Sequence, residues 1–547
     1  PGTAPPHAYS KVGGNGRGTL VLDDGTDNHD DIDAGATIAY TLEGIQEFKV
    51  MPHGVSAEYG KSGGGVVSLV TKSGTNVLHG SGFLYGRSDK LTSIDYFADP
   101  KNGGSGKPPY PRVQYGASIG GPVVQDRVWY HGSVELIDQK YTLPLARRIT
   151  DLQSYLVPLN IDVLPATAYR QPFEDLLGNG KVNFQLSQDH TGFVRYAIER
   201  TTLYNTGLRF GSALRATHPE WDDNHFNAWN MGIGETWVVS PTTLNSFNFQ
   251  YLHYKQNQFV PQCAEMGFTP EQCLLQTLVF PSVSTSPAPM TSGFPSRDEP
   301  RWQIKDDFSM LLGEHSLKLG ADVSFMPKLG GTFAVNAGSI TFFDDPDVIV
   351  NNTNGRYPQG FRTPGIVRAI ARITQNKLPN WHTEDARTFG GYINDDWRLS
   401  SKLTLNLGLR YDLYYIMDQP NLDKNRVYQV LKAIGSPFGD IPKTDTNNFA
   451  PRIGAAWDIG GDGRDIVRLG YGMFYPIQCI TPFSTQNLFQ EPTIYFTQTT
   501  ANSAIGVGAL ADYVYGVSPL PAGPPADPTE IPRGALISST PTTSASW

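Results

Sequence analysis

Long stretches of this chain alternate apolar and polar residues one by one. The clearest stretch runs from Leu403 to Tyr415, where leucine or tyrosine fills every odd position and polar residues or glycine fill the even positions through Asp412. Successive side chains of a strand point to opposite faces, so this pattern predicts a long strand between an apolar and a polar environment. Residues 127–136, 317–325 and 467–475 repeat it.

The length of these strands and of their connections favours a membrane β-barrel. The strands run for about ten residues or more, whereas ordinary strands average about five or six and membrane-spanning strands need about 9–11. Tight turns alternate with long connections, and such alternation is typical of an outer-membrane barrel. We predict the turns near 125–126, 187–190, 240–242, 313–314, 400–401 and 460–463, and loops at roughly 91–110, 141–178, 203–224, 257–300, 327–383 and 416–448.

The pattern predicts two domains. Residues 76–547 hold about thirteen barrel strands, and the stretch beyond about 477 is interpreted as loop. Bacterial single-chain barrels have even strand numbers and must close, so we expect further strands after Trp547. Residues 1–75 are glycine-rich and acidic, with short strands at Ile45–Met51 and Val66–Val70, and we predict a small α+β domain there. The start, PGTAPPHAYS, has no signal-peptide core, so we expect a fragment or a processed product.

Composition narrows the class of protein. Gly (57), Tyr (26) and Phe (27) are abundant in the 547 residues, which favours strands and turns. Lys plus Arg number 43 against 52 Asp plus Glu, and without a basic block we expect no nucleic-acid partner. The chain has no run of about 18 apolar residues, so we expect no transmembrane helix. Of the three cysteines, Cys263 and Cys273 are close enough for a loop disulfide, with free thiols an equal alternative, and Cys479 has no evident partner.

Two enzyme motifs are nearly matched in GVSAEYGKSGGGVV, residues 54–67. The phosphate-binding loop G-x-x-x-x-G-K-[ST] fails because five residues, not four, separate Gly54 from Gly60. The nucleophile elbow G-x-S-x-G needs a strand–turn–helix, but glycines and β-branched residues follow Ser62. We therefore predict a glycine-rich turn before a strand, and no enzyme.

The same stretch resembles the end of the plug domain in TonB-dependent outer-membrane receptors, closest to the Oar-like subgroup. The resemblance rests on EFKV at 47–50, SAEYGKSGGGVVSLVTKSG at 56–74, QYGASIGGP at 114–122, YINDDWR at 392–398 and FAPRIG at 449–454. These motifs keep the family's order over most of the chain. The family's compact L-D-G is replaced by Leu22-Asp23-Asp24-Gly25. We expect the front of the plug, the TonB-contacting segment and the last barrel strands to lie outside these 547 residues.

The resemblance implies a plugged barrel of the 22-stranded type, incomplete here, in the bacterial outer membrane. It implies active transport of an unknown ligand, captured by extracellular loops and admitted past the plug with energy from a TonB-type protein. It implies no cofactor, and its partners are membrane lipid, that coupling protein and the ligand. The plug motif would comprise Glu58, Tyr59, Gly60, Lys61, Gly63, Gly64, Gly65, Thr71, Lys72 and Gly74. The predicted lumen-facing residues are Lys318, Asp322, Arg410, Asp412 and Arg468.

Within that plug we expect Gly63–Gly65 to let the chain pass close to the barrel wall, and Glu58 and Lys61 to pair with wall charges. A cluster of aspartates, Asp23, Asp24, Asp27, Asp30, Asp31 and Asp33, lacks the glycine and glutamate of a calcium hand, and we predict a solvated acidic loop instead. The histidines are dispersed, and no His pair at zinc-site spacing with Glu is present.

Two alternatives remain open. One is an outer-membrane barrel used for adhesion or secretion, with a vestigial plug, which a TonB-contacting segment in the full gene would count against. The weaker one is a secreted all-β carbohydrate-binding protein, which would be soluble without detergent.

Overall fold

The computed structural model describes residues 19–521 with interruptions. The interruptions are residues 32–34, 52–55, 95, 97–98, 103–105, 108–109, 145–150, 160–167, 205–222, 260–276, 286–292, 335–337, 375–379, 416–431, 434, 438–439, 441–442 and 477–495. All three cysteines fall in them, so the predicted disulfide between Cys263 and Cys273 lies outside the described residues, as does Asp33.

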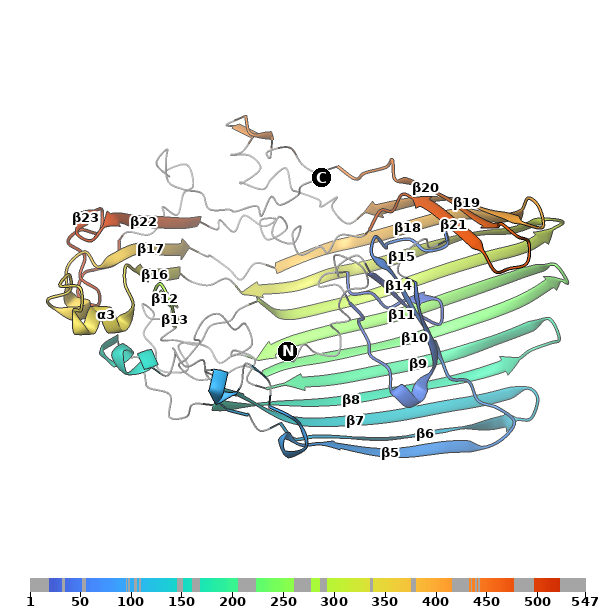
Figure 1. Ribbon diagram of the computed structural model, residues 1–547, viewed down its shortest axis with the longest axis horizontal. Helices are drawn as coiled ribbons and strands as arrows, with labels where there is room; N and C mark the ends of the chain where they lie inside the picture. Colours follow the sequence, from blue (N-terminus) through green and yellow to red (C-terminus); the bar gives the residue numbers. More distant parts are fainter. Residues whose placement is uncertain are drawn as a thin grey trace.

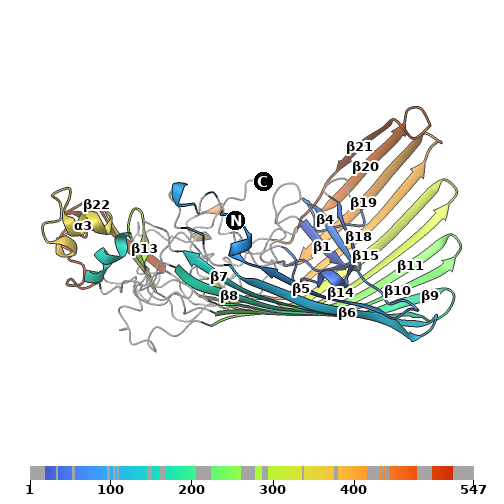
Figure 2. The same ribbon diagram turned by 60° about the horizontal axis from the view of Figure 1, so that its bottom comes forward.

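Thirteen long strands form one antiparallel sheet, which curves into an open trough (Figures 1 and 2). Each strand pairs with the next long strand along the chain, so the sheet is one continuous meander. This confirms the predicted strand number and the all-β class. The strands are β5 (His79–Arg87), β6 (Arg112–Val124), β7 (Val128–Pro144), β8 (Ala168–Gln185), β9 (His190–Leu203), β10 (Asp223–Ser240), β11 (Thr243–Phe259), β14 (Gly293–Leu312), β15 (His315–Ala334), β18 (Asn380–Arg398), β19 (Leu403–Tyr415), β20 (Phe449–Asp458) and β21 (Ile466–Gly472).

The longest strands extend well beyond a bilayer. β14 and β15 have 20 residues each and are joined through Gly313, whose φ of +62° suits a tight turn. At about 3.3 Å per residue, each is about 65 Å long, whereas a hydrocarbon core is about 30 Å thick. The strand ends away from the short turns must therefore stand outside any membrane that this sheet crosses.

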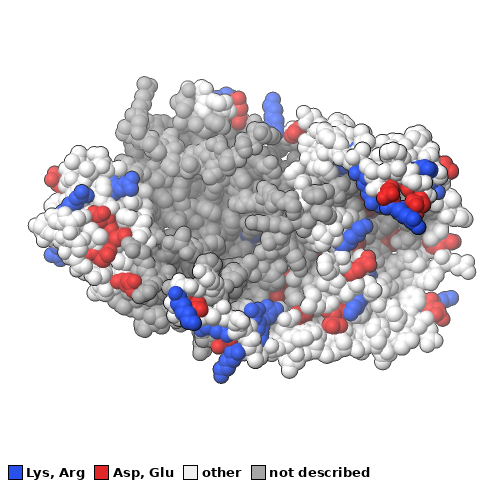
Figure 3. Space-filling model, in the orientation of Figure 1, with Lys and Arg blue, Asp and Glu red and all other residues white. Residues whose placement is uncertain are grey.

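The two faces of the sheet differ as the alternation predicts. On β15, Val323 is 45% exposed while its neighbours Asp322 and Ser324 are buried on the other face. On β18 and β19, Ile393 and Leu409 are likewise exposed, which leaves an apolar outer face. We call the opposite, concave and mostly polar face the wall. Figure 3 shows small groups in which charged side chains of both signs lie together, among mostly uncharged residues.

A small mixed sheet lies inside the trough (Figure 2). It consists of β1 (Thr19–Asp23), β2 (Thr26–Asp27), β3 (Ile45–Met51) and β4 (Gly65–Thr71), in the order β2-β1-β4-β3, with the 3-10 turn η2 (Leu42–Gly44). We call residues 19–74 the N-terminal unit. The expected strands β3 and β4 are present, and β4 also pairs in parallel with β1, which the sequence analysis left unassigned.

A second sheet forms beyond the ends of the long strands that lie opposite the short turns (Figures 1 and 2). Its order is β13-β12-β16-β17-β22-β23, and short helices pack beside it. We call this the loop-built unit. Its elements are η5 (Gln153–Leu159), β12 (Thr277–Val279), β13 (Ser284–Thr285), β16 (Gly338–Phe342), α3 (Pro346–Asn351), η7 (Gly360–Arg362), β17 (Val367–Thr374), β22 (Phe496–Ala504) and β23 (Val507–Gly508).

The loop-built unit corrects part of the prediction. Of the segments that we expected to be loop, 257–300, 327–383 and the part beyond 477 supply its strands, and 141–178 supplies η5. Together they form a shared apolar core that includes Leu278, Phe342, Ile349 and Ile370. The strands inside these segments are too short or too irregular to show the two-residue period of a strand in the sequence alone. The segments become strands because they bury apolar side chains against one another.

Candidate functional site

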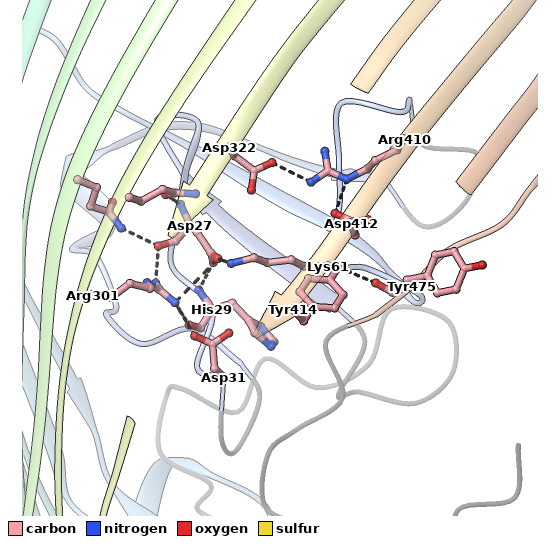
Figure 4. A network of polar contacts seen from close by, with 12 residues as sticks. Asp27, His29, Asp31, Lys61, Arg301, Asp322, Arg410, Asp412, Tyr414 and Tyr475 are labelled. Atoms are coloured by element: carbon pink, nitrogen blue, oxygen red, sulfur yellow. Dashed lines mark hydrogen bonds and ion pairs between the residues drawn. The ribbon is translucent and has the colours of Figure 1, made fainter. Parts of the chain in front are cut away.

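The N-terminal unit meets the wall through buried charged groups (Figure 4) and through an apolar patch in which Ile38 and Tyr40 pack with Leu252 and Tyr254 of β11. Lys61 donates from Nζ to Asp27 Oδ2 at 2.9 Å, and both side chains are buried. Arg301 of β14 reaches the same place from the wall, where it donates to the Asp27 carbonyl at 2.6 Å and to Asp31 Oδ2 at 3.1 Å. One wall arginine thus bridges two acidic positions of the N-terminal unit.

Arg410 of β19 forms a second contact. Its guanidinium donates to Asp322 of β15 and to Asp412, each at 2.8 Å, and it is 1% exposed. Its remaining nitrogen reaches the Glu58 carbonyl at 3.3 Å. A Cβ at Gly60 would collide with this guanidinium, so glycine is required for the chain to pass Arg410 this closely.

Glu58 joins the N-terminal unit to two wall lysines. Its carboxylate lies 2.6 Å from Lys318 Nζ on β15 and 3.7 Å from Lys305 Nζ on β14. Lys305 also pairs with Asp307 at 3.1 Å. The pairs at Glu58 are partly open to solvent, because the Lys318 side chain is 32% exposed.

Asp24 anchors the unit to a different part of the wall. Its carboxylate accepts from Arg195 of β9 at 3.0 Å and from Lys181 of β8 at 3.2 Å, and also from Thr71 of its own unit. Nearby, Gln250 of β11 donates to the Asp27 carbonyl at 2.7 Å. The polar contacts extend from Ser133 of β7, which meets Thr41, to Arg452 of β20, which donates to the Ser56 carbonyl.

The pKa values of the N-terminal unit follow from these contacts. Burial alone would raise the pKa of Asp27, but Lys61 and Arg301 outweigh it and hold that pKa well below its usual value. Burial would likewise raise the pKa of Asp24, but the charges of Arg195 and Lys181 outweigh burial and lower that pKa. Burial would lower the pKa of Lys61, yet the charge of Asp27 raises it. These groups are therefore ionised at neutral pH.

Asp23 differs from its neighbours. Burial dominates there and raises its pKa to about 7, although Arg195 acts in the opposite direction. Its Oδ1 accepts from Asn28 at 3.1 Å. Asp23 is thus the aspartate of this unit that titrates near neutral pH.

The predicted plug motif lies in this contact region, with roles that differ in detail from those expected. Lys61 bonds to Asp27 of its own unit rather than to a wall charge, whereas Glu58 does face wall lysines. The close approaches to the wall occur at Gly60 and at Gly74, where a Cβ would strike the Tyr130 backbone. In the predicted triplet, Gly65 has a φ of +125° and Gly63 faces Pro476.

The other predicted residues take less central places. Thr71 bonds to Asp24, Lys72 pairs with Glu43 at 3.5 Å, and Tyr59 lines a small cavity at the interface. Gly64 is buried. Among the predicted wall residues, Lys318, Asp322, Arg410 and Asp412 all take part in the contacts above. Arg468 is exposed and pairs across the strands with Ala456.

The acidic cluster is the main correction at this site. We expected a solvated loop, but Asp23, Asp24, Asp27 and Asp31 are each buried against the wall. The cause is the set of cations opposite them, Arg195, Arg301 and Lys181, which sequence reasoning missed because they lie on strands far away in the chain. The described residues contain no group of three or more His, Cys, Asp or Glu arranged to hold a metal ion.

The interface leaves little free space. A cavity of ≈ 30 Å³ lies between Glu58, Lys61, Asp322 and Arg410, which is room for about one water. A second of ≈ 20 Å³ lies beside His29 and Arg301. None of the helices in the described ranges is long and apolar enough to cross a bilayer.

The family described as "Outer membrane beta barrel domain" matches residues 70–173 and 166–546. The TonB-dependent transporter Oar of Myxococcus xanthus is 23% identical over 513 residues, which cover 80% of this chain and 44% of Oar.

Solved structures give the same fold. The outer membrane transporter YddB of Escherichia coli superposes with a TM-score of 0.50 at 11% identity, over 89% of this chain and 56% of YddB. The ferric enterobactin receptor PfeA of Pseudomonas aeruginosa superposes with a TM-score of 0.51 at 15% identity, over 85% and 55%. The chain therefore spans about half the length of the relatives that it matches.

Proposed function

Because the chain belongs to the outer membrane β-barrel domain family, as an Oar-like part of a TonB-dependent receptor, we propose that its N-terminal unit is the plug of an active transporter. The thirteen strands are then part of the barrel wall around that plug. The chain lies in the outer membrane, with the apolar outer face of the sheet against lipid. The family is one of transporters rather than enzymes.

The observation that carries this proposal is the chemistry of the contact between the N-terminal unit and the wall. Ion pairs at Asp24 and Asp31, and hydrogen bonds from Arg301 and Arg410 to backbone carbonyls of the unit, hold the unit in place. Each such contact to a charged group contributes about 1.5–3 kcal/mol net. The apolar patch around Ile38 and Tyr40 accompanies them, but it is less extensive than the internal core of the loop-built unit.

This chemistry suits a plug that is displaced under load. A pull transmitted by a TonB-type protein, through a segment outside this chain, would separate the contacts near Lys61 and Arg301 in succession. Water entering the gap would solvate each charge as it is released, which keeps every step small. The strand ends beyond the membrane and the loop-built unit would hold the ligand on the extracellular side while the plug moves.

A reversible cross-link tests the proposal in the full-length receptor. Thr41 Oγ1 of the N-terminal unit and Ser133 Oγ of β7 are 2.5 Å apart, so Thr41→Cys with Ser133→Cys places two sulfurs within bonding reach. A panel of ferric chelates, cobalamin, oligosaccharides and peptides is first tested for binding to the purified receptor. The oxidised double variant should bind the ligand so identified as wild type does, yet lose its uptake into cells, and reductant should restore uptake.

Ser133→Cys alone is the matched control and should transport normally under both conditions. Uptake that persists in the oxidised variant, once the cross-link is verified by mass spectrometry, contradicts a moving plug. If deletion of the TonB-type protein leaves the receptor's cellular phenotype unchanged, the adhesion or secretion alternative is favoured instead.

A further inference from the structure

A histidine, a carboxylate and a tryptophan recur in the same arrangement at two places on the outer face. On β9 and β10, His190 lies directly across from Trp237, and its Nδ1 is 2.7 Å from Glu235 Oε1. On β15 and β18, His315 lies directly across from Trp397, and its Nδ1 is 2.7 Å from Asp395 Oδ2. We call these two sets the rim triplets.

The rim triplets match in detail. In each, the histidine is the first residue after a short turn, and the carboxylate stands two residues before the tryptophan on the neighbouring strand. The imidazole stacks on the indole, with ring centroids 5.4 Å apart at His190 and 5.2 Å apart at His315, and interplanar angles of 13° and 16°. The two strand pairs are separated by other strands in the sheet, so this is a repeated device rather than one local contact.

Both triplets sit where the apolar outer face ends. Val194 and Leu319, on the same faces as His190 and His315, are exposed in the lipid-facing band. Each histidine is the first residue of its strand after a short turn, which places the triplets near the headgroup level of the leaflet on the short-turn side. They are partly open there, with the His315 side chain 41% and Glu235 42% exposed.

Their chemistry presents acceptors to the headgroup layer. A neutral histidine that donates Nδ1–H to the carboxylate leaves its Nε2 as an acceptor, and the carboxylate keeps its negative charge. Within the described part of the chain, the histidine is the one basic group recorded against Glu235 or Asp395. Oδ1 of Asp395 is buried and has no hydrogen-bond donor among the described residues.

We propose that the rim triplets bind the primary ammonium of amine-bearing phospholipid headgroups in the short-turn leaflet. A primary ammonium carries three N–H donors and a positive charge, so it satisfies both Nε2 and the carboxylate and lies against aromatic faces. A trimethylammonium headgroup has no N–H to donate. A phosphoglycerol headgroup brings a net negative charge toward a carboxylate. The order of preference is therefore phosphatidylethanolamine, then phosphatidylcholine, then phosphatidylglycerol.

The chain contains its own control. Leu403 lies directly across from Trp457, in the same relation to a short turn, but leucine replaces histidine and Ala455 stands where the carboxylate would be. This third position offers indole without acceptors. It should hold lipid without regard to the amine.

The test uses the full-length receptor extracted with the three phospholipids in equal amounts and matched acyl chains, and counts retained lipids by native mass spectrometry. Wild type should favour phosphatidylethanolamine over phosphatidylcholine by about two- to fivefold, the range expected for a solvent-accessible ion pair. Glu235→Gln with Asp395→Asn should abolish that preference. Leu403→His with Ala455→Asp should add a further amine-selective lipid.

Asp462→Asn is the matched control, since it removes a carboxylate from a short turn that has no triplet, and it should keep the wild-type preference. Heat-modifiable mobility on gels checks that each variant is folded. Equal retention of the three lipids by wild type, or an unchanged preference in the folded Glu235→Gln, Asp395→Asn variant, overturns the proposal. Lipid selectivity is measured without transport, so this result is independent of the proposed function.

Discussion

The N-terminal unit and the loop-built unit are both small sheets beside the same large sheet, and different chemistry dominates each of them: charged contacts in the docking of the first, and an internal apolar core in the second. The N-terminal unit docks through charges such as Asp24, Asp27 and Arg301. The loop-built unit has an apolar core in which Phe342 stacks on Phe280 at 4.6 Å and meets Phe361 edge-on. The first kind of contact can be opened in steps with water as a replacement partner, and the second loses its hydrophobic stabilisation as a whole.

The difference also shows in how each unit responds to loss of a partner. In an apolar core, removal of a side chain leaves a cavity whose cost depends on how far neighbours can collapse. In an ionic contact, removal of one partner leaves the other charged and buried, whereas removal of both can be nearly neutral. Hydrogen exchange of the full-length receptor, read separately for the two units, distinguishes these cases.

The largest effect is expected in the loop-built unit. Phe342→Ala removes a ring that is 1% exposed and should destabilise that unit by about 3–5 kcal/mol. Hydrogen exchange should accelerate across β16 and β17, while the N-terminal unit keeps its wild-type protection. Faster exchange in both units at once would mean that they unfold together, which contradicts separate stabilisation of the two units.

Arg301→Met should give the converse result. Asp27 and Asp31 lose the Arg301 cation, but Asp27 keeps Lys61. We therefore expect the free energy of docking of the N-terminal unit to weaken by about 2–3 kcal/mol. Exchange should rise in β1 and β2 and stay unchanged in β16. Lys305→Met is a matched wall variant that leaves the Asp27 cluster intact and should affect docking less.

Docking should also depend on pH through Asp23. Burial raises the folded-state pKa of Asp23 from 3.8 to about 7. The stability that protonated Asp23 gives to the docked unit is therefore fully present below pH 4 and is lost as the pH rises through 7. Asp24 and Asp27 have lowered pKa values and do not change charge in that window. Protection of β1 should therefore fall between pH 5 and pH 8, and Asp23→Asn should reduce this slope. A slope identical in wild type and variant would assign the titration to another group.

The smallest effect is expected at Glu58. Its pairs with Lys318 and Lys305 are partly exposed, so Glu58→Ala should weaken docking by about 0.5–1 kcal/mol. The change should shrink in high salt, because screening already weakens the pair. Glu58→Ala combined with Lys61→Ala in the full-length receptor should alter ligand uptake, and unchanged uptake with normal folding would count against a gating role for this contact.

The sequence predicted the large sheet because its information is local. The alternation from Leu403 to Tyr415 is visible without any partner strand, and so are the turn at Gly313 and the number of long strands. It did not predict the loop-built unit, since β12 has only three residues and β22, FTQTTANSA, shows no apolar–polar alternation. Both become strands only against β16 and β17. For the same reason it mistook Asp24 and Asp27 for solvated residues.

What the sequence determined by itself is the course of each strand and the side that each residue takes, because successive side chains along an extended backbone must point to opposite faces. What only the tertiary structure decided is which charges meet. Asp27 and Arg301 are 274 residues apart, and no local period joins them. Curvature of the sheet brings them together, and burial then makes their pairing obligatory, since an unpaired charge at that place would be costly.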